Sequence, residues 1–152
     1  MSMIDAAARF EEIKGEEVIC SDWLEIDQER VDQFAACTGD HQWIHVDEAR
    51  AAKGPYERTI AHGFLLLSLV NFFRGKGDFI SEGIKMSVNY GLNRVRFLTP
   101  VTVGSRIRDR AVLTEVEKKS SNRVLVTVTH TFEIEGEDKP ACVAEVLSLV
   151  YS

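Results

Sequence analysis

The segment from Thr38 to His45 contains two side chains that could transfer protons. Asp40 and His45 are five residues apart in the sequence, and a tight loop could direct both toward one water molecule. Ordinary carboxyl and imidazole groups titrate near about 3.9 and 6.5, so together they supply a proton acceptor and a proton donor at neutral pH. We interpret them as a candidate acid–base pair. The alternative is that Asp40 binds loop amides while His45 packs against Trp43.

A second candidate group is the backbone amide of Gly63, in the segment Ile60-Ala61-His62-Gly63. This segment precedes an apolar run that we predict to be helical. The first N–H groups of a helix have no partner within it, so the Gly63 amide could stabilise negative charge developing on a carbonyl oxygen. Alternatively, Gly63 only permits close packing. We expect His62 to orient the loop, although it could also face solvent.

The apolar run from Gly63 to Gly75 has hydrophobic residues at every angle around a helical wheel. A helix of this kind must be enclosed by protein, and its length favours a helix over a strand. Asn71 is one of its few polar residues and needs a hydrogen-bond partner if it is buried. It could reach a catalytic side chain or bond only within the fold.

The segments before this run have helix boundary signals. Asp27 is a candidate N-cap for a helix that ends at Gly39, and its apolar residues recur at helical spacing. A second short helix is predicted from Asp47 to Lys53, closed by Gly54 and followed by Pro55. Residues 41–46 between these helices are predicted to form a tight connection.

The second half of the chain alternates with a period of two, which predicts strands. The first runs from Ile84, half-buried, with a bulge near Asn93 and Arg94 where the alternation shifts. A second strand follows the turn at Gly104, and a third covers residues 124–134. Residues 136–140 form a hairpin connection, and the apolar last strand, residues 141–151, is expected to be covered on two sides.

These elements predict one α+β domain over residues 1–152, with residues 1–15 as an N-terminal helical extension. An enclosed helix with several long antiparallel strands fits a curved sheet wrapped around that helix, which is the hot-dog arrangement. A ferredoxin-like α+β sandwich fits the same pattern nearly as well.

Charge and cysteine content limit the function classes. The net charge of −6 disfavours nonspecific nucleic-acid binding, whereas residues 51–110 are basic and could bind an anionic small molecule, with Arg94 and Arg96 among the candidates. Three scattered cysteines indicate neither a disulfide framework nor a zinc site. No signal peptide or membrane-spanning run is evident, so we expect a cytoplasmic protein.

Two motifs and the strand that follows them resemble a known family. Gly39 to His45 and Ala61-His62-Gly63, followed by the strand that contains residues 90–97, are similar to the MaoC-like (R)-specific 2-enoyl-CoA hydratases, within the NodN-like branch. The resemblance covers most of residues 20–151. Each motif alone is weakly specific, but their order on this pattern of elements is fairly specific. The resemblance implies a single hot-dog domain.

The resemblance also implies roles for individual residues. Asp40 and His45 correspond to the catalytic pair, and the Gly63 amide to the donor that binds the thioester oxygen. Asn71 falls where some members have a polar residue that supports the pair. The family motif has Asn-Pro where this chain has Gln42-Trp43, so the bulky Trp43 is expected to narrow the acyl site.

The predicted reaction is reversible hydration of a trans-2-enoyl-CoA to an (R)-3-hydroxyacyl-CoA. No metal or redox cofactor is expected, because coenzyme A is part of the substrate. We expect Trp43, His62, Asn71 and Arg94 to contact this acyl-CoA thioester. The alternatives are a hot-dog acyl-CoA thioesterase and a noncatalytic acyl-CoA or acyl-carrier binding module. A homodimer is also expected, because a single curved sheet leaves an edge strand exposed.

Overall fold

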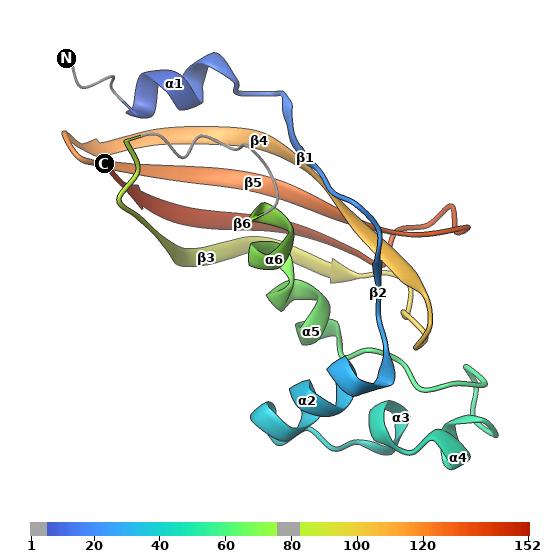
Figure 1. Ribbon diagram of the computed structural model, residues 1–152. Coiled ribbons are helices and arrows are strands. Elements are labelled where there is room, and N and C mark those ends of the chain that lie inside the picture. Colours follow the sequence, from blue (N-terminus) through green and yellow to red (C-terminus); the bar gives the residue numbers. More distant parts are fainter. Residues whose placement is uncertain (1–5, 76–82) are drawn as a thin grey trace.

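An antiparallel six-stranded sheet curves around a pair of short helices (Figure 1). The computed structural model describes residues 6–75 and 83–152. The strand order is β1-β4-β5-β6-β3, and β2 also pairs with β4. The strands are β1 (Glu17–Cys20), β2 (Leu24–Glu25), β3 (Met86–Phe97), β4 (Arg106–Ser120), β5 (Arg123–Ile134) and β6 (Cys142–Tyr151). The predicted α+β hot-dog arrangement is confirmed.

The helices before the central pair begin and end near the predicted residues. In α2 (Gln28–Thr38), the Asp27 carboxylate accepts the Arg30 N–H at 2.8 Å, and Gly39 ends the helix with a φ of 77°. The predicted second helix is α4 (Glu48–Ala51), capped by Asp47, and it ends two residues before Lys53. The predicted tight connection contains one helical turn, α3 (Trp43–Val46).

The apolar run forms two short helices, so the prediction of one enclosed helix was wrong in two respects. The chain forms α5 (Gly63–Ser68) and α6 (Val70–Arg74), separated at Leu69. Leu65, Leu66 and Phe73 are buried against the sheet, but the Phe64 side chain is 69% exposed. The physical reason is that one sheet covers only one side of the helices, and the other side is uncovered within a single chain.

The edge strand β3 also differs from its prediction. Alternation predicts one buried and one exposed face, but nearly every residue of β3 is exposed, because β3 pairs only with β6 and no helix covers it fully. The predicted bulge is confirmed by a register shift between Leu92 and Arg94, and a second shift lies between Asn89 and Gly91. The exposed apolar residues of this edge are Met86, Val88, Tyr90, Leu92 and Phe97.

The remaining strands follow the sequence pattern. β4 begins after the turn at Gly104, β5 covers the predicted residues, and a hairpin at Gly136 leads to β6. Residues of β6 alternate between buried and half-buried, so one face is fully covered by this chain and the other only in part. The strands β1 and β2 were not predicted, because segments of four and two residues are too short to show a period.

A short N-terminal helix, α1 (Ala6–Glu12), covers the end of the sheet farthest from α2 (Figure 1). It lies within the predicted helical extension of residues 1–15, of which residues 1–5 are outside the described residues. Phe10 is buried against Ala111, Leu113 and Val126. No helix in the described ranges is long and apolar enough to span a lipid bilayer.

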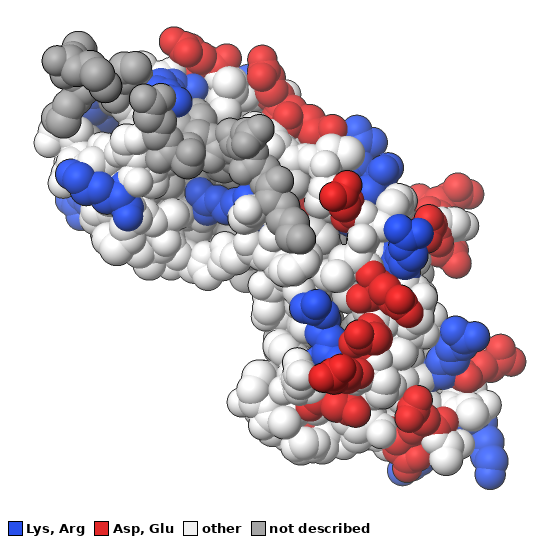
Figure 2. Space-filling view, in the orientation of Figure 1, with Lys and Arg blue, Asp and Glu red and all other residues white. Residues whose placement is uncertain are grey.

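Arginines of β4 explain why the basic middle segment is not a uniform positive surface. Figure 2 shows acidic and basic side chains close together along one side of the molecule. Arg106 pairs with Glu135 at 3.2 Å, Arg108 with Glu133 at 2.6 Å, and Arg110 with Glu17 at 2.7 Å. These three arginines are therefore matched by acidic partners on β1, on β5 and in the turn that follows β5.

A buried polar pair crosses the sheet between β4 and β5. The Nδ1 of His130 lies 2.7 Å from an Asp109 carboxylate oxygen, and both side chains are almost fully buried. The other carboxylate oxygen of Asp109 has no hydrogen-bond partner among the described residues. His130 is therefore the side-chain partner of this buried carboxylate.

We expect His130→Ala to lower the free energy of unfolding by about 3–5 kcal/mol, because it leaves the Asp109 carboxylate buried without a partner. Equilibrium urea unfolding measures this loss. The double variant Asp109→Leu with His130→Leu is the control, since it removes both polar groups and should be less destabilised than His130→Ala. Equal or greater destabilisation of the double variant would contradict this account.

Candidate functional site

Asp40 lies on the loop that follows α2. Because Gly39 adopts a left-handed conformation, the chain turns sharply away from the helix axis at this point. The Asp40 Oδ1 accepts the Gln42 N–H at 3.3 Å, and the side chain is 53% exposed. The carboxylate is thus held by its own loop and remains open to solvent.

His45 lies on α3 with its ring buried. Its Nδ1 is 2.7 Å from the carbonyl oxygen of Ile60, which can only accept a hydrogen bond, so Nδ1 carries the proton. This leaves Nε2 of the neutral ring as an acceptor. Burial lowers the pKa of His45 below its ordinary value of 6.5 and outweighs the Ile60 hydrogen bond, which raises it. His45 is therefore neutral and able to accept a proton at neutral pH.

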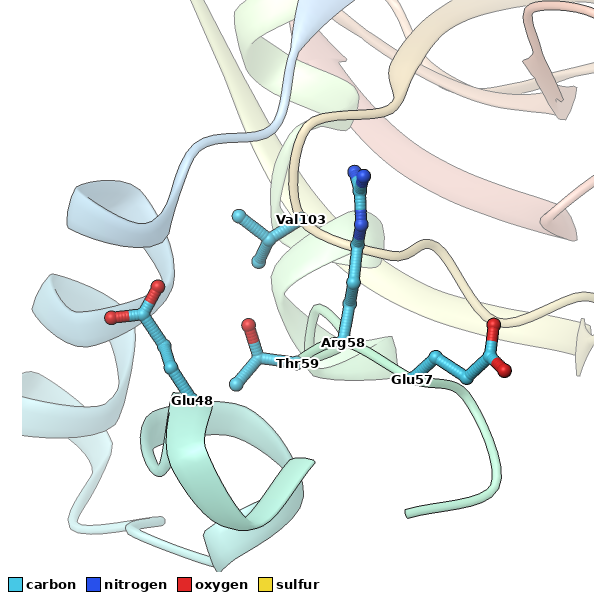
Figure 3. A pocket seen from close by; sticks show the side chains of 5 residues that line it. All are labelled: Glu48, Glu57, Arg58, Thr59 and Val103. Carbon is cyan, nitrogen blue, oxygen red and sulfur yellow. The ribbon is translucent and has the colours of Figure 1, made fainter. Parts of the chain in front are cut away.

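A partly buried chain of hydrogen bonds connects α3 to α2 and to the segment before α5. Gln28 of α2 donates to the carbonyl oxygen of His45 at 2.8 Å and accepts a hydrogen bond from the Thr59 hydroxyl. On its outer side, Thr59 lines a cleft of about 300 Å³ together with Glu48, Glu57, Arg58 and Val103 (Figure 3). Gln28 and Thr59 fix the position of His45, although nothing in their spacing indicated this role.

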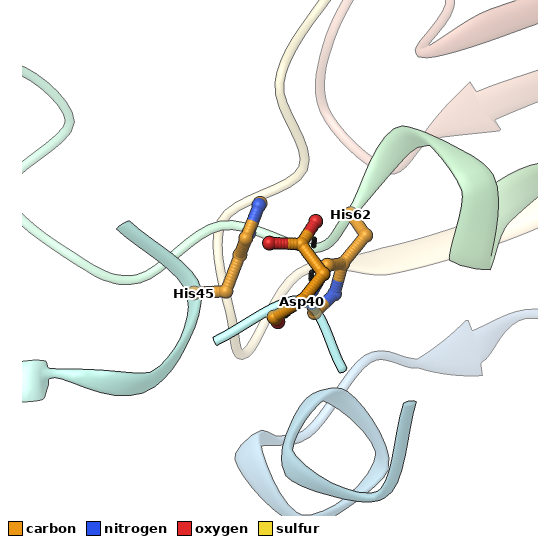
Figure 4. A group of neighbouring side chains, drawn as sticks. All are labelled: Asp40, His45 and His62. Carbon is orange, nitrogen blue, oxygen red and sulfur yellow. Dashed lines mark hydrogen bonds and ion pairs between the residues drawn. The ribbon is translucent and has the colours of Figure 1, made fainter. Parts of the chain in front are cut away.

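His62 brings the segment before α5 against Asp40 and His45. Its ring stacks on that of His45 with centroids 3.8 Å apart and planes inclined by 22°. Its Nε2 lies 3.0 Å from the Asp40 carbonyl oxygen and 4.0 Å from an Asp40 carboxylate oxygen. One ligand-type atom from each of the three side chains falls within 4.8 Å of the others (Figure 4). The structure therefore brings together three of the predicted residues.

Gly63 follows His62 directly and is the first residue of α5. Its N–H donates to no group among the described residues, as expected for the first turn of a helix. A Cβ added at this position would lie 3.1 Å from the Phe97 ring, so Gly63 also allows close packing. The close approach of Phe97 supports the packing interpretation of Gly63, and the role of its N–H as a donor to a substrate oxygen stays a prediction. Because α5 has only six residues, we consider the Gly63 N–H as a single hydrogen-bond donor and not the helix dipole.

The two histidines and the aspartate are poorly arranged to hold a metal ion. Ring nitrogen lone pairs lie in the plane of the imidazole, and zinc needs its ligands at about 2.0–2.2 Å in a tetrahedron. Because the two rings are nearly parallel, their in-plane lone pairs cannot converge on one ion.

The other predicted substrate contacts, Trp43, Asn71 and Arg94, are not members of this cluster. Trp43 packs under the guanidinium of Arg50, 4.3 Å from the ring centroid, and against Gly54. Arg94 is exposed on β3. Asn71 lines a groove of about 580 Å³ between the central helices and the edge strand, which also contains Leu67, Ser68, Val70, Asn89, Tyr90, Gly91, Leu92 and Val146. Asn71 therefore lines this groove, and it makes no hydrogen bond to Asp40 or His45 among the described residues.

Comparisons with known proteins agree with this architecture. The family model described as "MaoC like domain" matches residues 9–134. The chain is 49% identical over 145 residues to 3-hydroxyacyl-thioester dehydratase Z of Mycobacterium tuberculosis, covering 95% of each protein. It is 41% identical over 151 residues to Nodulation protein N of Rhizobium leguminosarum bv. viciae, covering 99% of this chain and 91% of that protein.

Solved structures extend the comparison to the fold. The (R)-hydratase from A. caviae involved in PHA biosynthesis superposes with a TM-score of 0.72 at 26% identity, covering 89% of this chain and 94% of that chain. A monoamine oxidase regulatory protein from Archaeoglobus superposes with a TM-score of 0.80 at 24% identity, covering 94% of both chains. The second likeness concerns the fold alone.

Proposed function

Because the chain belongs to the MaoC-like domain family, we propose that it is a hydro-lyase that interconverts trans-2-enoyl-CoA and (R)-3-hydroxyacyl-CoA. The family and its dehydratase and hydratase members support a lyase-type enzyme. The observation that carries the finer proposal is the convergence of Asp40, His45 and His62 within 4.8 Å. His62 directly precedes Gly63, whose N–H donates to no group among the described residues.

In the proposed mechanism, one water molecule lies between the Asp40 carboxylate and Nε2 of His45. The pair takes a proton from this water as its oxygen bonds to C3 of the enoyl thioester. The electrons of the double bond move to the thioester carbonyl, forming an enolate oxygen that accepts the Gly63 N–H. As the enolate collapses, the pair returns a proton to C2 on the same face. Water is thereby added across the double bond, and no electrons are exchanged with another reagent.

The lowered pKa of His45 suits this role. A base must be unprotonated at the working pH, and the pKa of His45 lies below 6.5 because its ring is buried. Proton transfer and carbonyl polarisation are both supplied by groups of this chain. In this proposal the reaction therefore needs no metal or redox cofactor, and coenzyme A enters with the substrate.

Incubation with crotonyl-CoA tests the proposed function. Loss of the enoyl absorbance without release of free thiol is the expected result, with chiral analysis of the product showing the R isomer. Release of thiol would instead identify a thioesterase, a reading disfavoured by the absence of Asp and Glu from α5 and α6. Binding of crotonyl-CoA without either change would identify a binding module and contradict the proposed reaction.

We also propose that two copies pair through β3. This edge strand exposes apolar side chains, and the Tyr90 side chain is 62% exposed. The exposed apolar surface continues from β3 to Phe64 on the uncovered side of α5. Sedimentation at micromolar concentration should show a dimer. Leu92→Lys should shift the protein toward monomer, while Glu137→Lys in the exposed hairpin should leave the sedimentation unchanged. A monomeric unmodified protein would contradict this proposal.

A further inference from the structure

The ring of His62 lies between the rings of two other residues, His45 and Phe34. The His45 ring stacks on one side at 3.8 Å between centroids, and the Phe34 ring of α2 lies at 4.9 Å. Only 3% of the His62 surface is exposed. A substrate therefore has little access to this ring, which argues against direct substrate contact.

The hydrogen bonding of His62 determines which nitrogen carries its proton. Nε2 faces the Asp40 carbonyl oxygen at 3.0 Å, and a carbonyl oxygen only accepts, so Nε2 is the donor. Nδ1 is buried and has no partner among the described residues. The hydrogen bond to the Asp40 carbonyl oxygen therefore places a ring proton on Nε2.

We infer that His62 is a positioning residue, whose ring fixes both the backbone of Asp40 and the plane of His45. This inference rests on the proposed function, because it concerns the same acid–base pair. His62 is the N-cap residue of α5 and is bonded directly to Gly63. One side chain thus connects the loop after α2, helix α3 and the N–H proposed to bind the thioester oxygen. Its position sets the spacing among all three groups.

The same stacking affects proton affinity at His45. Burial and the Ile60 hydrogen bond have the largest effects on the pKa of His45. The neighbouring His62 ring has a smaller effect and lowers this pKa, and Asp40 raises it. The titratable groups around His45 are thus His62 before α5, Asp40 on the loop and, through Gln28 of α2, Asp32. Removing the imidazole at position 62 should raise the pKa of His45.

Two substitutions separate positioning from simple packing. His62→Phe keeps an aromatic ring but removes the donor to Asp40, whereas His62→Gln keeps an N–H at a similar reach but removes the ring. We expect His62→Phe to lower kcat by roughly 10- to 100-fold, since displacements of about 1 Å can have such effects. KM should change by less, and His62→Gln should recover only part of the lost kcat, because it restores the donor to Asp40 but not the ring that stacks on His45. His41→Phe, at an exposed neighbour of Asp40, is the control for adding a phenyl ring.

Measuring kcat against pH adds a readout that packing alone does not move. The acid limb should shift to higher pH in both His62 variants, and NMR titration of the His45 ring should show the same direction without relying on turnover. Full kcat in His62→Phe, or an unmoved His45 titration, would overturn the inference even if the unmodified enzyme hydrates crotonyl-CoA. Lack of any hydration by the unmodified protein would instead overturn the proposed function.

Discussion

Asp40→Asn should lower kcat for hydration of crotonyl-CoA by about 10²–10⁴-fold, the usual contribution of a positioned acid–base group. Asparagine keeps the oxygen that accepts the Gln42 N–H, so the loop should retain its conformation. The side chain is about half exposed, and its replacement should not create a cavity. The expected loss therefore reports the missing carboxylate charge. It is measured by the decrease in enoyl absorbance at saturating substrate.

His45→Asn provides a matched test of the other half of the pair. The asparagine amide can replace Nδ1 as the donor to the Ile60 carbonyl oxygen, but it has no counterpart of Nε2. A similar loss of kcat is expected, with the thermal unfolding midpoint near that of the unmodified protein. Asp138→Asn in the exposed hairpin serves as the control for removing a carboxylate. Unmodified rates in both Asp40→Asn and His45→Asn would remove these residues from the mechanism.

The second large effect is expected from Gly63→Pro, which removes the N–H proposed to bind the thioester oxygen. Loss of one such donor typically lowers kcat by about 10²–10³-fold. Proline is well accepted at the first position of a helix. His62 already has the extended conformation that a residue before proline requires, with φ −60° and ψ 138°. The backbone should therefore accept this substitution.

Gly63→Ala is the matched control for the added side-chain atoms. Both substitutions place a Cβ about as close to Phe97 as 3.1 Å, so both require a small shift of that ring, but alanine keeps the N–H. We expect Gly63→Ala to retain much more activity than Gly63→Pro in the same absorbance assay. Equal losses in the two variants would show that close packing, and not hydrogen bonding, requires glycine at position 63.

Local features of the fold were predictable because their causes lie within a few residues. The Asp27 cap and the left-handed Gly39 define α2, and the alternating pattern defines β4 and β5. The bulge near Arg94 also follows from a local shift in alternation. The same local reasoning missed β1 and β2, whose conformation depends on pairing with β4, about 90 residues later in the chain.

In the candidate site, too, some contacts could be predicted from local spacing and others could not. Asp40 and His45 are separated by one short loop and one helical turn, so their proximity could be proposed from spacing alone. The stacking of His62 on His45 could not, because it requires the segment before α5 to return against α3. The support of His45 by Gln28 and Thr59 likewise joins residues 31 positions apart.

The sequence by itself determined the residue types, the helix caps, the strand periods and the two motifs that identify the family. Only the tertiary structure decided that His62 is enclosed with His45, that Trp43 packs against the α4 turn and that Asn71 faces a separate groove. The physical reason is that caps and periods arise from interactions between near neighbours in the chain. The contacts of a buried ring depend instead on how distant segments pack together.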